Sequence, residues 1–337
     1  MKKALIYIIV LLAVASCEKE EKPFVLPPPG DLTKVVADIG TNYLKAVYIS
    51  LAKNTQQTRN WQDWDIAFEA SETGSYVYLN EGKYMFACHT NSSDFATADS
   101  TGKEWRLDND ELTDDSTAVG KWWSNSTSSD VMVIDRGRIY YVGITASQRF
   151  KKIKIEHVNA NEYVFSFCDY GSNTPVSYTI TKDPNHSLMY FSFDDGGKMV
   201  DMSPPKDDWD FVLTRYAHIY YGEPLNSPYR NYMVNGGLNN KWNGVTGVRM
   251  IKDVSTSYIP FAQVTSNDAA LHSYSEEANT IGFEWKIVDI NTGAYNIVPD
   301  IYYILKDKNG FYYKIRFVDF YDDNGTKGYI TFEYQRL

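Results

Sequence analysis

An internal duplication constrains the fold of this 337-residue chain more than any other feature of its sequence. A Tyr-x-Ser segment at 48–51 and an Asp-Trp-Asp segment at 63–68 recur at 190–193 and 208–213. We also align residues 78–82 with 233–237, and residues 139–142 and 150–155 with 301–304 and 311–316. Matches in the same order indicate two copies of one structural unit. We therefore expect a first domain at 32–185 and a second at 186–337.

Short runs rich in Val, Ile, Tyr, Phe and Thr recur along the whole chain, and several of them alternate apolar with polar residues. This pattern is typical of β-strands. We expect strands at 46–51, 64–69, 75–79, 83–88, 131–134, 139–144, 151–157, 162–168, 176–181, 188–193, 209–215, 218–221, 280–288, 301–306, 311–320 and 329–334. Turns at 195–197, 308–310 and 323–325 contain the Gly and Asn residues that hairpins favour. The sequence predicts an all-β protein of two tandem antiparallel units with few or no helices.

The N-terminus has the pattern of an export signal. Lys2 and Lys3 precede an apolar stretch at 4–16, which ends in small residues directly before Cys17. The stretch is shorter than the roughly 20 residues of a membrane-spanning helix. Because the cysteine resembles the lipobox of bacterial lipoproteins, we expect a signal peptide at 1–16, a lipid on Cys17 and a tether at 17–31. An ordinary signal peptide with an incidental cysteine is the alternative. Residues 18–22 resemble the export signal of surface lipoproteins, which predicts an outer-membrane protein facing the cell surface.

Composition and motifs argue against several functions. The net charge of −10 disfavours binding to nucleic acid or to anionic lipid headgroups. We find no Cys-x-x-Cys, zinc-binding helix motif, phosphate loop or nucleophile elbow, so we expect no enzyme. The acidic stretch at 108–115 lacks the glycine and final Glu of a calcium-binding loop, and we interpret it as a solvated loop. Cys88 and Cys168 are either a disulfide or two buried thiols, and the sequence leaves both possibilities open.

A family resemblance comes from the Asp-Trp-Asp strand after a Tyr-x-Ser strand, and from the C-terminal stretches 302–317 and 328–334. These resemble the HmuY-like family of haem-binding surface lipoproteins of Bacteroidetes, closely over residues 188–337 and more loosely in the first copy. The resemblance implies an all-β, hand-like fold. It also implies haem capture at the cell surface and delivery to an outer-membrane TonB-dependent receptor. The best-known members consist of a single unit, whereas this chain has two.

Haem iron takes His nitrogen or Met sulfur as axial ligands. By resemblance, these donors lie upstream of the closing hairpin, which makes Met250 and His272 candidate haem ligands and His218 and Met233 further candidates. The alternatives are a methionine that fills the core and a histidine in a loop. The residues that would line a haem slot or meet its propionates are Tyr216, Tyr220, Tyr221, Tyr229, Tyr232, Trp242, Lys241 and Arg249.

Three functions are therefore compatible with the sequence. The first is haem binding, which the resemblance favours. The second is glycan binding in a polysaccharide-uptake system, because sugars stack on exposed Tyr and Trp rings. The third is a role in adhesion or assembly without a small ligand. We expect Trp64 and Trp209 to be core anchors, because aromatic side chains within strands are usually buried.

Overall fold

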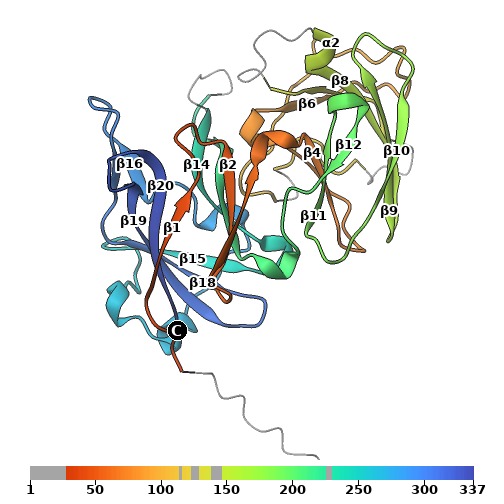
Figure 1. Ribbon diagram of the computed structural model, residues 1–337. Helices are drawn as coiled ribbons and strands as arrows, with labels where there is room; N and C mark the ends of the chain where they lie inside the picture. The colour runs from red at the N-terminus through yellow and green to blue at the C-terminus, as the bar shows by residue number, and fades with distance from the viewer. Residues whose placement is uncertain (1–27, 114–115, 123–128, 138–145, 225–229) are drawn as a thin grey trace, which may run out of the picture.

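The computed structural model describes residues 28–113, 116–122, 129–137, 146–224 and 230–337, which form two β-sandwiches side by side (Figure 1). Residues 1–16, Cys17, the expected strand at 139–144 and Tyr229 lie outside the described residues. Among the described residues, the strands are antiparallel, and residues in strands far outnumber those in helical turns, which confirms the predicted fold class.

The first sandwich consists of two antiparallel sheets that share one apolar core. Its strands are β4 (Ile66–Glu69), β5 (Val77–Leu79), β6 (Phe86–His89), β7 (Met132–Asp135), β8 (Phe150–Val158), β9 (Glu162–Asp169), β10 (Val176–Thr181), β11 (Leu188–Ser192) and β12 (Lys198–Val200). The strand order is β12-β11-β4-β5 in one sheet and β10-β9-β8-β7-β6 in the other.

The second sandwich contains both ends of the described chain. Its strands are β1 (Thr33–Asp38), β2 (Lys45–Ser50), β3 (Thr55–Asn60), β13 (Phe211–Ile219), β14 (Asn231–Asn239), β15 (Thr246–Ile251), β18 (Ile301–Lys306), β19 (Tyr312–Tyr321) and β20 (Lys327–Arg336). The order is β14-β13-β2-β3 in one sheet and β1-β20-β19-β18-β15 in the other. A separate hairpin joins β16 (Lys286–Val288) to β17 (Tyr295–Ile297). Because β1 pairs with β20, the first described residues lie next to the C-terminus, and the Gly30 N–H donates to the Arg336 carbonyl at 3.0 Å.

Helices in the described residues are one turn long. They are α2 (Ala146–Arg149), α3 (Ser266–Ala269) and the 3-10 turns η1 (Trp61–Asp63), η2 (Glu81–Lys83), η3 (Asp194–Gly196), η4 (Lys206–Asp208), η5 (Lys241–Asn243), η6 (Phe261–Gln263) and η7 (Ala278–Thr280). The single strand expected at 280–288 is wrong, because this stretch begins in η7 and becomes extended only in β16. Cys88 and Cys168 are buried free thiols on β6 and β9, which β7 and β8 separate in the sheet.

Equivalent strands of the two copies exchange partners. β2 and β4 both come from the first copy, yet β2 pairs with β13 and β4 pairs with β11. Each four-stranded sheet therefore contains one hairpin from each copy. The boundary near residue 186 stays a prediction about the repeated units, and the sheets combine strands from both sides of it.

Hydrogen bonds around the Asp-Trp-Asp segments show which residues of the two copies correspond. The Asn80 side-chain amide donates to the Trp64 carbonyl at 2.8 Å, and the Asn240 amide donates to the Trp209 carbonyl at 3.1 Å. The counterpart of Asn80 is therefore Asn240 rather than Asn235, so our alignment of 78–82 with 233–237 is wrong.

A buried ion-pair cluster distinguishes the first copy from the second. Asp65 is 0% exposed, and its carboxylate lies 2.8 Å from Lys83 Nζ and 2.8 Å from Arg136 Nη2. Burial disfavours the charged carboxylate, but the two cations outweigh it and lower the pKa of Asp65. Asp210, its counterpart, accepts the Leu51 N–H at 2.6 Å, and burial raises its pKa to about 6. The pKa of the aspartate at this position is thus lowered in the first copy and raised in the second.

Candidate functional site

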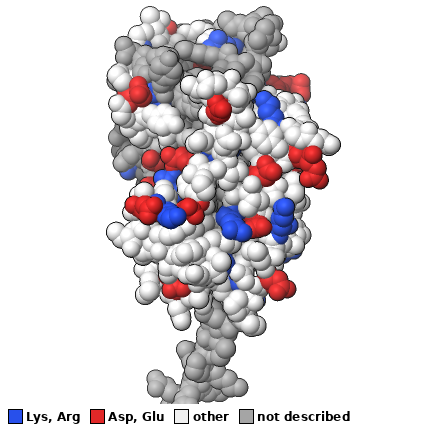
Figure 2. Space-filling model, turned by 90° about the vertical axis from the view of Figure 1, so that its left-hand side faces the viewer, with Lys and Arg blue, Asp and Glu red and all other residues white. Residues whose placement is uncertain are grey.

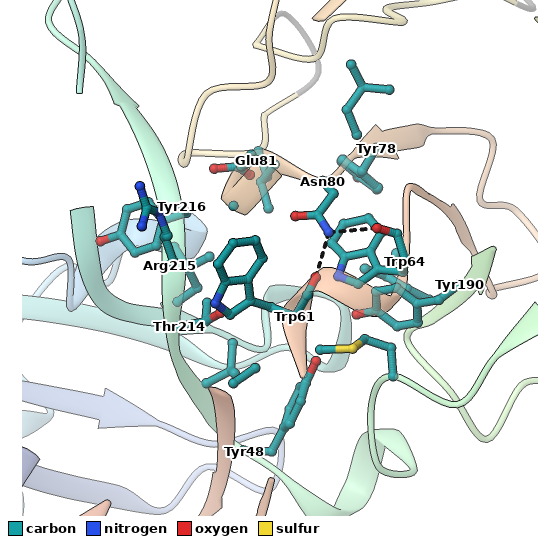
Figure 3. A pocket seen from close by; sticks show the side chains of 18 of the residues that line it. Tyr48, Trp61, Trp64, Tyr78, Asn80, Glu81, Tyr190, Thr214, Arg215 and Tyr216 are labelled. Carbon is teal, nitrogen blue, oxygen red and sulfur yellow. Dashed lines mark hydrogen bonds between the residues drawn. The ribbon is translucent and has the colours of Figure 1, made fainter. Parts of the chain in front are cut away.

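The two sandwiches meet at a cavity lined by aromatic side chains (Figure 3). Tyr48 packs edge-on against Trp209, and Tyr190 packs edge-on against Trp64, with 5.0 Å between ring centroids in both pairs. These four residues are equivalent in pairs, so the cavity lies where the two copies face each other. Trp209 is buried as predicted, whereas Trp64 is half-buried at the cavity wall. Other lining residues include Trp61, Tyr78, Asn80, Glu81, Met202, Thr214, Arg215, Tyr216 and Trp242.

This cavity is too small for a porphyrin. Its volume is about 80 Å³, whereas pockets for small molecules usually have about 300–1,000 Å³. Burial raises the pKa of Tyr190 to about 12. Burial, together with Asp110 and Asp108, also raises the pKa of Glu81 well above its usual range. The wall therefore combines aromatic rings and the guanidinium of Arg215 with Tyr190 and Glu81, which favour their neutral forms, and the cavity has room for a few water molecules.

The structure places Met250 and His272 in one region but in different environments. Met250 lies on β15, is 1% exposed and packs in a cluster with Ala269 and Tyr302. His272 follows α3, is half-buried, and its Nδ1 lies 3.3 Å from the Ser257 hydroxyl. As a haem ligand, Met250 would have to leave a packed core. The assignment of this pair stays a prediction.

His218, by contrast, lies partly exposed at the far end of β13. Its Nδ1 lies 2.9 Å and 3.1 Å from the two carboxylate oxygens of Asp110. Its ring packs edge-on against Tyr220 and Phe283, with centroid separations of 4.7 Å and 5.1 Å. The side chain is 23% exposed. A ring nitrogen held on one side by a carboxylate and flanked by aromatic rings is a suitable donor for a metal in a flat ligand.

The structure does not bring His218 and Met233 together as a pair. On the paired strands β13 and β14, Ala217 lies opposite Met233, and His218 lies opposite Tyr232. Successive side chains of a strand point to opposite faces, so His218 and Met233 project from different faces of the sheet. Met233 packs instead against a cluster that contains Phe86.

A groove of about 440 Å³ lies beside Phe283, which lines the groove and also contacts the ring of His218. His218 itself does not line the groove. This volume falls in the range of small-molecule sites. Arg249, predicted to meet a propionate, lines the groove and forms an ion pair with Glu284. The apolar part of the wall consists of Ile251, Ile287, Val298 and Ile301. The groove therefore combines an apolar wall with a cation.

The tyrosines predicted to form a ligand slot divide between two places. Tyr221 and Tyr232 are 58% and 50% exposed, and Tyr220 is also exposed at the same end of β13 and β14. Tyr216 is buried in the wall of the central cavity, which Trp242 also lines. Lys241 donates to a backbone carbonyl of the first sandwich at 2.5 Å and does not line the groove.

Our interpretation of 108–115 as a solvated loop is wrong for Asp108 and Asp110, which are both buried. The Asp108 carboxylate accepts the N–H groups of Leu79 and Ala118 at 2.7 Å and 2.6 Å, and burial raises its pKa to about 7. Composition gave no signal for this, because a run of acids looks the same whether water or a neighbouring sheet covers it. The role of Asp110 was missed for the same reason. Phe283 was missed because only the fold brings its ring to His218.

The surface of the molecule carries charges of both signs, which are interspersed on the face shown in Figure 2. No helix in the described part of the chain has the length and apolar composition needed to cross a membrane. Within that same part, no three His, Cys, Asp or Glu side chains form a group that could hold a metal ion.

The chain matches the model of the HmuY protein family over residues 42–334. No curated protein matches it significantly. Among solved structures it is similar to the apo HmuY analog of Tannerella forsythia (11% identity, 92% of this chain and 97% of that chain aligned, TM-score 0.26). It is also similar to apo PinO of Porphyromonas gingivitis (10% identity, 91% and 97%, TM-score 0.29) and to an HmuY-like heme-binding protein of Bacteroides vulgatus (12% identity, 90% and 90%, TM-score 0.24).

These TM-scores are low, so the structural similarities carry no argument about this chain. The match to the family model, in contrast, extends over most of the sequence and spans both sandwiches. The protein therefore belongs to the HmuY family.

Proposed function

We propose that this protein binds haem on its second sandwich, in the groove next to His218. Membership of the HmuY family carries the proposal, since the resemblance to that family implies haem capture. Haem has flat apolar faces, an iron that takes a His nitrogen, and two anionic propionates. The groove has the size and the apolar wall that such a ligand requires, and Phe283 in this wall contacts the ring of His218.

Each of these residues would have a distinct role. His218 would supply a ring nitrogen to the iron, which changes the spectrum and redox chemistry of the bound haem. Phe283 and Tyr220, which pack edge-on against the His218 ring, would supply apolar contacts to the porphyrin. Arg249 would exchange Glu284 for a propionate, since both partners are carboxylates. Met250 and His272 remain alternative donors, although Met250 is buried.

We also propose the setting in which this binding takes place. A lipid on Cys17 would hold the protein in the outer membrane with both sandwiches at the cell surface, and the haem would pass to a TonB-dependent receptor. The export signal and the tether in the sequence support this arrangement. We expect a binding protein rather than an enzyme, as the family implies.

A titration with haemin tests the proposal. Purified protein is expected to sharpen and shift the Soret band until one ligand is bound. His218→Ala is expected to displace the Soret band and weaken binding, because the iron loses its nitrogen. Met250→Leu and His272→Ala serve as matched controls and should behave like the wild type. No saturable spectral change in the wild type would refute haem binding, whereas a loss confined to the two controls would move the site to that pair.

The exposed tyrosines favour a second candidate function. Tyr221 and Tyr232 present their rings to solvent, and sugar rings stack on such surfaces. Under this hypothesis the protein is retained on a polysaccharide affinity gel, and Tyr221→Ala reduces the retention. If the protein neither binds haemin in the titration nor is retained on the polysaccharide gel, adhesion or assembly would be left as the function.

A further inference from the structure

The carboxylate that contacts His218 comes from the other sandwich. Asp110 belongs to the segment 105–113, which follows β6 of the first sandwich, whereas His218 lies on β13 of the second. Asp110 is 1% exposed, so water does not solvate its charge. A buried carboxylate needs hydrogen-bond donors, and His218 Nδ1 lies within hydrogen-bond distance of both of its oxygens.

The segment that carries Asp110 is anchored on both sides of this residue. Asp108 accepts two backbone N–H groups of the first sandwich. The Asn109 side-chain oxygen accepts the Ile219 N–H of the second sandwich at 3.3 Å, and the Leu112 carbonyl accepts Lys241 Nζ. The backbone around Asp110 is therefore fixed relative to β13, and this fixes the position of the Asp110 carboxylate beside His218.

An ionised carboxylate can only accept hydrogen bonds, so the histidine beside it must carry its proton on Nδ1. In the neutral ring this leaves the lone pair on Nε2, and the bond made by one ring nitrogen sets the role of the other. We infer that Asp110 is a positioning residue that holds His218 in the Nδ1–H tautomer and so presents Nε2 as a ready donor. The first sandwich thereby completes a ligand site on the second. The tautomer does not depend on the proposed function; the identity of the ligand as haem does.

Nuclear magnetic resonance of ¹⁵N-labelled histidine tests the inference in the protein without ligand. At an alkaline pH, at which the ¹⁵N shifts show the ring to be neutral, His218 should have a protonated Nδ1 and an unprotonated Nε2. Asp110→Asn keeps the volume but removes the charge, and should shift His218 toward the Nε2–H form. Glu111→Gln is the matched control, because it removes a neighbouring charge and leaves the contact between Asp110 and the His218 ring in place.

A second readout uses haemin. Loss of a carboxylate behind a metal-bound histidine typically weakens metal binding about 10–100-fold, and we expect this loss in Asp110→Asn but not in Glu111→Gln. A wild-type spectrum with the proton on Nε2 would overturn the inference without any variant. A tautomer shift in Asp110→Asn with unchanged haemin affinity would support the role of Asp110 but refute His218 as the haem donor.

Discussion

The same substitution in the two copies of the Asp-Trp-Asp segment should affect stability to very different extents. Asp65→Asn removes the buried carboxylate that Lys83 and Arg136 share, while Arg136 keeps its ion pair with Asp194. Removal of one member of a buried ion pair typically costs about 3–5 kcal/mol of unfolding free energy. Asp210→Asn keeps an oxygen for the Leu51 N–H and removes a carboxylate that burial disfavours. We therefore expect Asp210→Asn to change the unfolding free energy by less than about 1 kcal/mol at neutral pH.

Thermal and denaturant unfolding measure this difference. Asp65→Asn should lower the melting temperature by about 6–20 °C, if each kcal/mol corresponds to about 2–4 °C in a protein of this size class. Asp63→Asn is the matched control, because Asp63 flanks the same tryptophan but is exposed. Equal effects at Asp65 and Asp210, or a loss below about 1 kcal/mol at Asp65, would refute the assignment of the buried cluster as a first-copy feature.

Three further predictions follow from the fold and the sequence. Burial raises the pKa of Asp108 to about 7, above the roughly 3.9 of an unfolded chain. The contribution of Asp108 to stability is therefore present at low pH and is lost, by up to about 4 kcal/mol, as the pH rises from about 4 to 7. Asp108→Asn should flatten this part of the stability profile, and an unchanged profile would contradict the assignment. Cys17→Ala should release the protein from the membrane fraction, and full retention in that fraction would argue against lipidation at this residue. Fragments 32–185 and 186–337 should fold when mixed but not alone, because β2 pairs with β13 and β4 with β11; a native-like spectrum from either fragment by itself would rule out this interdependence.

The strands that sequence analysis located are those with strong side-chain patterns. The Phe- and Tyr-rich strands β9, β19 and β20 alternate or bury both faces, and their predicted bounds agree closely with the structure. β3 was missed because its residues are polar and mostly exposed, and β14 because glycines replace side chains in its middle. A strand that is held mainly by backbone hydrogen bonds has no side-chain pattern from which the sequence could predict it.

The repeat was found from its sequence, but the exchange of strands was not. Both copies of the Tyr-x-Ser strand have the same chemistry, so nothing in Tyr48 or Tyr190 shows which Asp-Trp-Asp strand each one joins. The same holds for the candidate site. His218 is one of several scattered histidines in the sequence, and only the fold brings it beside Asp110, which lies 108 residues earlier in the chain.

The pairing of β1 with β20 has a practical consequence for how the protein stands on a surface. Because β1 and β20 are paired, a fluorophore or tag joined after Leu337 would lie close to Gly30, near the start of the described chain (Figure 1). Such a label would report on that end of the second sandwich. It would not obstruct a partner that binds at the opposite end, near the β13–β14 hairpin.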